Sequence, residues 1–250
     1  MAEDWAVGVH AVAAAIDAGE VEQLWVAKER AGDRRIQDVL AAAERQGTAL
    51  RWAAAAELDR LGVGHQHQGL AARLLPAPAR KLSEVLESIP APGLLLILDG
   101  ILDPHNLGAC LRSAEAAGVH AVLLPKDHAC PINATVRKAA AGAASRLPVV
   151  VVTNLARSIA SLKEQGYWIA GLAGEASADL YQADLRGPLA LVLGSEEKGL
   201  RRLVREHCDF LWRIPMSGAI ESLNVSVAAA LALFEARRQR QAQAKTDELR

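Results

Sequence analysis

Short, continuous apolar runs alternate with helical patterns through the second part of the chain, and this alternation limits the possible folds most. The runs occupy residues 94–98, 121–124, 149–152, 168–172, 189–193 and 210–214. A strand that is apolar at every position is buried on both faces, which is typical of a parallel sheet covered by helices on both sides. The pattern therefore predicts an α/β domain built on a parallel sheet.

A smaller α/β unit is expected between residues 8 and 75. One helix is indicated by apolar residues at helical spacing before Gly19, and a second by a similar pattern before Gly47. Strands are expected at residues 23–27, 50–53 and 70–75. The polar loop between the last two contains His65 and His67, and without a third ligand nearby a surface loop is a better interpretation than a metal site.

Two proline-rich breaks, at residues 75–81 and 90–93, separate these regions. They predict an N-terminal domain at 1–76, a linker at 77–93 and a main domain at 94–250. The end of the chain, from Arg237 onward, loses apolar periodicity and is expected to fray.

Bulk composition narrows the class of protein without naming a partner. The chain is 51% hydrophobic and 23% charged, as in soluble globular proteins, and its 28 Lys and Arg nearly balance its 29 Asp and Glu. A nucleic-acid site would therefore depend on local clustering of charge. Three cysteines without CxxC spacing suggest a reducing cytoplasm and no zinc. The apolar patch at residues 11–16 is too short for a signal peptide or membrane span.

Ligands of parallel sheets gather at the carboxyl ends of the strands, so the loops after the apolar runs are the places to look for chemistry. In the first loop, Asp103 can cap a helix that begins with Pro104. Asn106 and Arg112 lie six residues apart, close to two turns, so they can share part of one helix surface. Arg112 is equally interpretable as a solvated helix charge.

The second loop, residues 194–200, has Gly194 and Gly199 on either side of two carboxylates. Glycines at both ends permit a ligand to approach the backbone closely, although a charged hairpin-like turn is the plainer interpretation. The loop lacks the GK[ST] ending of a phosphate loop, and neither of these two loops contains the GxGxxG fingerprint. A Rossmann dinucleotide site therefore loses support.

The third loop, residues 214–227, leads from an apolar run through small residues into a helix. A helix start offers unpaired N–H groups and a positive dipole end, which favours a ligand seat. A simple turn in which Ser222 or Asn224 caps the helix is about as plausible for this loop alone.

Together the three loops resemble the three motifs of the SpoU branch of the SPOUT methyltransferases. The resemblance rests on Asn106 with Arg112, on Gly194-x-Glu196-x-x-Gly199, and on residues 214–226. Further likeness at residues 8–12, 67–69, 98–112, 152–157 and 205–208 extends it over about residues 8–240. It is greatest to members that methylate the guanosine ribose 2'-hydroxyl of 23S ribosomal RNA.

The resemblance implies a catalytic domain with a C-terminal trefoil knot and S-adenosylmethionine as cofactor. It implies a cofactor site at Leu193, Gly194, Gly199, Ile214, Met216 and Leu223. The residues implied for catalysis are Arg112, Asn106, Glu196, Ser222 and Asn224. Since an arginine pKa above about 12 makes it a poor base, we expect Arg112 mainly to orient the hydroxyl and the adjoining phosphate.

The resemblance also implies a homodimer and an RNA partner. The helix at residues 225–234 is interpretable equally as a dimer surface or as a core helix. The N-terminal unit resembles RNA-binding modules of the ribosomal protein L30 type, which points to 23S ribosomal RNA or an assembling large subunit, and Arg201, Arg202 and Arg205 add a basic stripe. The alternatives are transfer-RNA ribose methylation, RNA binding without catalysis, and another nucleotide-dependent α/β enzyme.

Overall fold

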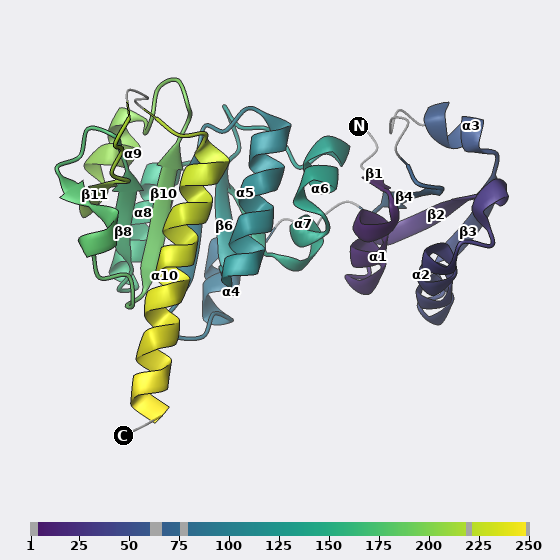
Figure 1. Cartoon of the computed structure of the whole chain (residues 1–250), viewed down its shortest axis with the longest axis horizontal. Coiled ribbons are helices and arrows are strands. Elements are labelled where there is room, and N and C mark those ends of the chain that lie inside the picture. Colours follow the sequence, from purple (N-terminus) through teal and green to yellow (C-terminus); the bar gives the residue numbers. More distant parts are fainter. Residues whose placement is uncertain (1–4, 61–66, 76–79, 219–221, 249–250) are drawn as a thin grey trace. The chain divides into compact units, whose positions relative to one another are not determined.

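The computed structural model describes residues 5–60, 67–75, 80–218 and 222–248 (Figure 1). The chain forms two compact units, Met1–Pro78 with Ile132–Arg146, and Ala79–Pro131 with Leu147–Arg250. Two features differ from the expected limits: the proposed linker contains helix α4 (Leu82–Glu87) of the second unit, and residues 132–146 group with the first.

The first unit is built on a four-stranded sheet in the order β1-β4-β2-β3. Its strands are β1 (Trp5–Val7), β2 (Val21–Ala27), β3 (Ala49–Ala53) and β4 (Leu70–Leu74). Strand β4 is antiparallel to β1 and β2, whereas β2 and β3 are parallel. Strand β1 was not expected, because three residues give too little pattern to detect.

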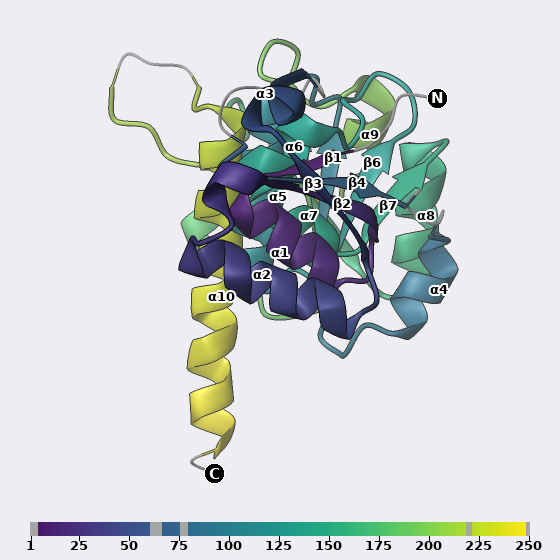
Figure 2. The same cartoon turned by 90° about the vertical axis from the view of Figure 1, so that its right-hand side faces the viewer.

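Two helices cover one face of this sheet, α1 (Val9–Asp17) and α2 (Arg34–Arg45) (Figures 1 and 2). Both are where the apolar spacing predicts them, and they bury Ile16 and Ile36 against the strands. The same unit contains the short helices η1 (Lys28–Arg30), α3 (Ala55–Leu58), α6 (Ala134–Ala140) and α7 (Ala143–Arg146).

His67 is not a surface residue as expected. It is only 8% exposed, and its Nδ1 accepts a hydrogen bond from the Gly69 N–H at 2.9 Å. The ring therefore supports the turn that leads into β4. His65 lies outside the described residues.

The second unit has the predicted parallel sheet, in the order β7-β6-β5-β10-β8-β11-β9. Its strands are β5 (Leu94–Asp99), β6 (Ala121–Pro125), β7 (Val149–Val152), β8 (Trp168–Leu172), β9 (Ala178–Asp179), β10 (Leu189–Gly194) and β11 (Phe210–Arg213). Every pairing is parallel. Only β9, two residues long at the sheet edge, was missed.

Helices cover both faces of this sheet, as the continuous apolar strands predict. Helices α4, α8 (Leu155–Glu164) and α9 (Arg202–Glu206) pack on one face. Helices α5 (Pro104–Ala117) and α10 (Val225–Glu248) lie side by side on the other (Figure 1). None of the described helices is both long and apolar enough to span a membrane.

The expected fraying from Arg237 does not occur, since α10 continues to Glu248. Arg240 anchors it by donating hydrogen bonds to the carbonyls of Leu185, Pro92, Gly93 and Gly187 at 2.6 to 3.2 Å. The sequence pattern missed this anchor because it is polar and nonperiodic. The trefoil knot stays a prediction, because strand order and register do not define threading.

Candidate active site

Three loops at the carboxyl ends of the strands meet at the carboxylate of Glu196. Its Oε1 accepts hydrogen bonds from Asn106 Nδ2 at 3.1 Å, from Asn224 Nδ2 at 2.6 Å and from the Val225 N–H at 3.1 Å. Asn224 Nδ2 also donates to Asn106 Oδ1 at 2.9 Å. One residue from each predicted motif therefore enters a single polar cluster.

Helix caps hold the two asparagines in place. Asp103 Oδ1 accepts from the N–H groups of His105 and Asn106 at 2.6 and 3.1 Å, so Asp103 caps α5 as predicted. Asn224 Oδ1 accepts from the Ser226 N–H at 2.9 Å and is the cap of α10. Of the two caps considered for this helix, Asn224 is the one that the structure uses.

The loop that carries Glu196 is a tight turn closed by two backbone hydrogen bonds. Ser195 and Gly199 donate to each other's carbonyls at 3.1 and 2.8 Å, and Gly199 has a φ of +62°. A Cβ on Gly194 would lie 2.0 Å from the carbonyl carbon of Gly199. The glycines are therefore required by the turn itself, as the hairpin-like interpretation predicts.

A buried carboxylate fixes the far end of this loop. Asp99, only 1% exposed, accepts from the Arg201 N–H at 2.9 Å and from Arg201 Nε at 2.5 Å. Asp99 ends β5 and lies opposite Gly194 in the register of β5 and β10. Asp99 was not predicted as a site residue, although a single acidic residue at the end of an apolar run was a usable signal.

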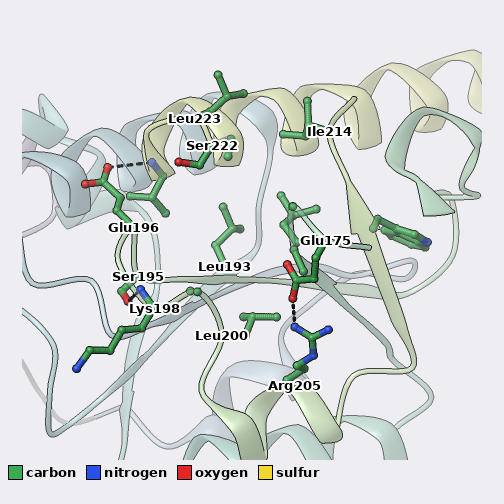
Figure 3. Close-up of a pocket in the computed structure, with 18 of the residues that line it drawn as sticks. Glu175, Leu193, Ser195, Glu196, Lys198, Leu200, Arg205, Ile214, Ser222 and Leu223 are labelled. Carbon is green, nitrogen blue, oxygen red and sulfur yellow. Dashed lines mark hydrogen bonds and ion pairs between the residues drawn. The ribbon is translucent and has the colours of Figure 1, made fainter. Parts of the chain in front are cut away.

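A cavity of about 360 Å³ opens between the second and third loops (Figure 3). Leu193, Leu200 and Leu223 contribute apolar surface to its walls. Its charged lining residues are Glu175, Glu196, Lys198 and Arg205. This combination of size, apolar walls and a few polar groups fits a nucleoside that carries an amino-acid tail, as S-adenosylmethionine does.

Glu175 and Arg205 form an ion pair at the side of this cavity (Figure 3). Glu175 follows β8, and Arg205 lies on α9. The hydrogen bond from the Arg205 guanidinium, with a further backbone bond, lowers the pKa of Glu175. Glu175 was not singled out from the sequence, because one acidic residue after a strand does not stand out.

A second cavity, of about 480 Å³, adjoins the first. The two share lining residues Ser195, Glu196, Lys198 and Val225. Asn106 also lines the second cavity. The polar cluster therefore stands where a ligand of one cavity would face a ligand of the other.

All six residues predicted for the cofactor line the first cavity, as does Ser222: Leu193, Gly194, Gly199, Ile214, Met216 and Leu223. Arg112 does not join them. It is exposed on α5, lines neither cavity, and forms no hydrogen bond or ion pair within the described part of the chain. Six residues turn a helix by about 600°, which leaves its side chain about 120° from that of Asn106.

Cys110 lies on α5, and its thiol is buried. Burial and the negative charge of Glu196 raise the pKa of this thiol to about 12. The described residues contain no group of three or more potential metal ligands. Asn106, Glu196 and Asn224 are donors and acceptors locked in one geometry, so what they can do is position another molecule.

The fold of the parallel-sheet unit is that of the SPOUT class of methyltransferases, as two solved structures show. A crystal structure titled the SpoU methyltransferase AviRb from Streptomyces viridochromogenes with AdoMet matches with a TM-score of 0.82 at 25% identity, covering 96% of this chain and 92% of that one. A structure titled RNA 2'-O ribose methyltransferase matches with a TM-score of 0.79 at 32% identity, covering 95% and 88%.

Two family models match consecutive parts of the sequence. The SpoU rRNA Methylase family matches residues 93–234, and the RNA 2'-O ribose methyltransferase substrate-binding family matches residues 5–79. The chain belongs to the SpoU rRNA methylase family. Similar proteins include two 23S rRNA (guanosine-2'-O-)-methyltransferases named RlmB. The one from Xylella fastidiosa strain Temecula1 is 53% identical, and the match covers 94% of this chain and 96% of that protein. The one from Xanthomonas axonopodis pv. citri is also 53% identical, with the same coverage.

Proposed function

We propose that this protein methylates the 2'-hydroxyl of a guanosine ribose in 23S ribosomal RNA, with S-adenosylmethionine as methyl donor. The observation that carries the proposal is the position of Glu196, which joins the three motif loops at the boundary of two adjoining cavities. The relatives named above, similar over nearly their whole length, support the same reaction.

The first cavity is the proposed cofactor site. When bound, the cofactor supplies a methyl group already activated on a sulfonium. Leu193, Leu200 and Leu223 provide apolar surface for an adenine, and Gly194 also lines this cavity. The task left to the protein is to bring the ribose hydroxyl into line, and alignment of this kind can supply roughly 7 to 11 kcal/mol.

Asn106, Glu196 and Asn224 are the proposed positioning cluster for the ribose, and Ser222 supports the third loop. Arg112 is proposed to orient the hydroxyl and its neighbouring phosphate through its planar guanidinium. Because Arg112 makes no polar contact within the described chain, its partners belong to the RNA or to a second subunit.

We propose a homodimer that uses the outer face of α10. Val227, Leu231 and Phe234 recur at helical spacing on this helix and are 46%, 38% and 46% exposed. A stripe of this kind is costly to leave in water and is typical of a subunit interface. Leu231→Glu should give a monomer in analytical ultracentrifugation; an unchanged dimer would exclude this face.

The N-terminal unit is the proposed RNA-substrate domain, since residues 5–79 match a substrate-binding family. Ribosomal RNA is favoured over transfer RNA because the full-length relatives include this unit, whereas a tRNA-modifying enzyme of the same fold covers only 64% of this chain. Such a substrate places the enzyme in the cytoplasm, on 23S RNA or an assembling large subunit.

The test is transfer of a labelled methyl group from S-adenosylmethionine to 23S RNA, followed by mapping of 2'-O-methyl groups. We expect one modified guanosine in RNA from cells that lack the gene, and none in RNA that is already modified. Transfer RNA serves as the competing substrate. Label on transfer RNA alone, or on the base instead of the ribose, would refute the proposal.

A further inference from the structure

The charged pair of Glu175 and Arg205 has no role in the three motifs, yet both residues line the proposed cofactor cavity. They come from different elements, the loop after β8 and helix α9, so the pair closes one side of the cavity wall (Figure 3). Their side chains are 61% and 41% exposed, which places them at its rim. An exposed ion pair adds little stability, so folding alone does not explain it.

The residues around the Glu175–Arg205 pair indicate which part of the cofactor would contact it. Leu172 and Trp212 are register partners on β8 and β11, and they line the cavity with Ala173 and Gly174, which directly precede Glu175. The apolar lining at Leu193 and Leu200 therefore continues to the ends of these two strands. An adenosine belongs there, and the reacting end belongs beside Glu196.

The charges of Glu175 and Arg205 favour a neutral hydrogen-bond donor, such as a hydroxyl, over a cationic one as the ligand group at Glu175. Arg205 donates a hydrogen bond to one oxygen of the Glu175 carboxylate, Oε1, and the other oxygen is Oε2. An ammonium that approached Oε2 would also meet the guanidinium of Arg205, and like charges repel. A hydroxyl suffers no such repulsion, and carboxylates at the ends of parallel strands bind ribose hydroxyls in other nucleotide sites.

We propose that Glu175 binds the ribose hydroxyls of the cofactor's adenosine and that Arg205 positions its carboxylate for this. The inference rests on the proposed function, since it assigns part of the same cofactor site. The lowered pKa of Glu175 is consistent with it, because the group then stays an ionised acceptor at neutral pH. Leucines and backbone of the motif loops hold the adenine, and the Glu175–Arg205 pair selects a nucleoside with an intact ribose.

The experiment measures binding of S-adenosylhomocysteine to the full-length enzyme by titration calorimetry, beside two analogues. One analogue lacks both ribose hydroxyls, and the other, 5'-methylthioadenosine, lacks the amino-acid tail. Glu175→Gln should weaken S-adenosylhomocysteine about tenfold, which is the usual effect of losing a charged hydrogen bond. The same loss should appear with methylthioadenosine and vanish with the dideoxy analogue.

The matched control is Glu206→Gln, which breaks the exposed Arg202–Glu206 pair on the same helix without touching the cavity. It should leave all three affinities unchanged. If Glu175→Gln is unstable, Arg205→Met gives the same test with Glu175 in place. The unaltered enzyme gives a test that needs no variant, since it should bind the dideoxy analogue about tenfold more weakly than the parent.

Several results would overturn the assignment. A Glu175→Gln loss that persists with the dideoxy analogue, or that disappears with methylthioadenosine, would place another group of the cofactor at this carboxylate. Equal affinity of the unaltered enzyme for S-adenosylhomocysteine and for the dideoxy analogue would show that the enzyme does not bind the ribose hydroxyls. Methyl transfer to RNA is measured separately, so an enzyme that reads the ribose but leaves 23S RNA unmethylated would refute the proposed function alone.

Discussion

Replacing Glu196 by glutamine tests whether one carboxylate organises the site. The substitution keeps the shape but removes the charge at the oxygen that accepts from Asn106, Asn224 and the Val225 N–H. A hydrogen bond to a charged group contributes about 1.5 to 3 kcal/mol and a neutral one about 0.5 to 1.5. Since the side chain is exposed, we take the low end and expect a loss of about 1 to 2 kcal/mol in all.

That loss corresponds to a fall in melting temperature of about 2 to 8 °C for a chain of this size. Activity should fall further than stability, because a misplacement of about 1 Å in an aligned site can cost about 100-fold in rate. Thermal unfolding and methyl transfer at saturating cofactor measure the two effects. The control is Glu164→Gln, the same exchange at an exposed position on α8, for which we expect no effect on activity.

The two effects must be separable for the interpretation to hold. If Glu196→Gln retained the transfer rate and melting temperature of the Glu164→Gln control, the cluster would be incidental. If the melting temperature fell and the rate per folded molecule did not, Glu196 would be a structural cap of α10 and nothing more.

Three further substitutions test contacts that hold the second unit and its loops together. Gly194→Ala should abolish cofactor binding in titration calorimetry while the protein stays folded by circular dichroism, because a Cβ would lie 2.0 Å from Gly199; retained affinity would show that the turn can shift. Arg240→Lys should lower the free energy of urea unfolding by about 2 to 3 kcal/mol, since lysine cannot reach four carbonyls at once; an unchanged value would deny the anchor. Burial lowers the pKa of His120, whose Nδ1 accepts a hydrogen bond from the Leu94 N–H. Neutral His120 therefore contributes to the free energy of unfolding above the ordinary histidine pKa of about 6.5, and this contribution is lost as the pH falls below that value. His120→Asn should therefore flatten the pH dependence of the free energy of unfolding between about pH 5 and 7. An unaltered slope would show that another group causes this pH dependence.

The parallel sheet was predictable because its strands are buried on both faces and read as unbroken apolar runs. All six expected runs became strands, within a residue or two of the expected ends. The two missed strands, β1 and β9, are three and two residues long, and their pairing is decided by neighbours distant in sequence. The same holds for His67, whose burial depends on the turn around it rather than on a pattern.

The site was predictable as far as each loop follows a strand of one parallel sheet. Position at the carboxyl edge brought Asn106, Glu196 and Asn224 together, and the glycines marked the turn between them. Residues that act through long-range pairing escaped prediction. Asp99 meets Arg201 across 102 positions of the chain, and no local pattern encodes such a partner.

Arg112 lies outside the polar cluster that the three loops form. Helical spacing of six residues suggested a surface shared with Asn106, but at about 100° per residue the two side chains diverge, and Arg112 stays exposed without a polar partner in the described chain. The Asn106–Glu196–Asn224 cluster, in contrast, is complete within the chain. If Arg112 acts on the ribose, a second molecule must complete the site, and loss of Arg112 should then reduce methyl transfer while leaving cofactor affinity intact.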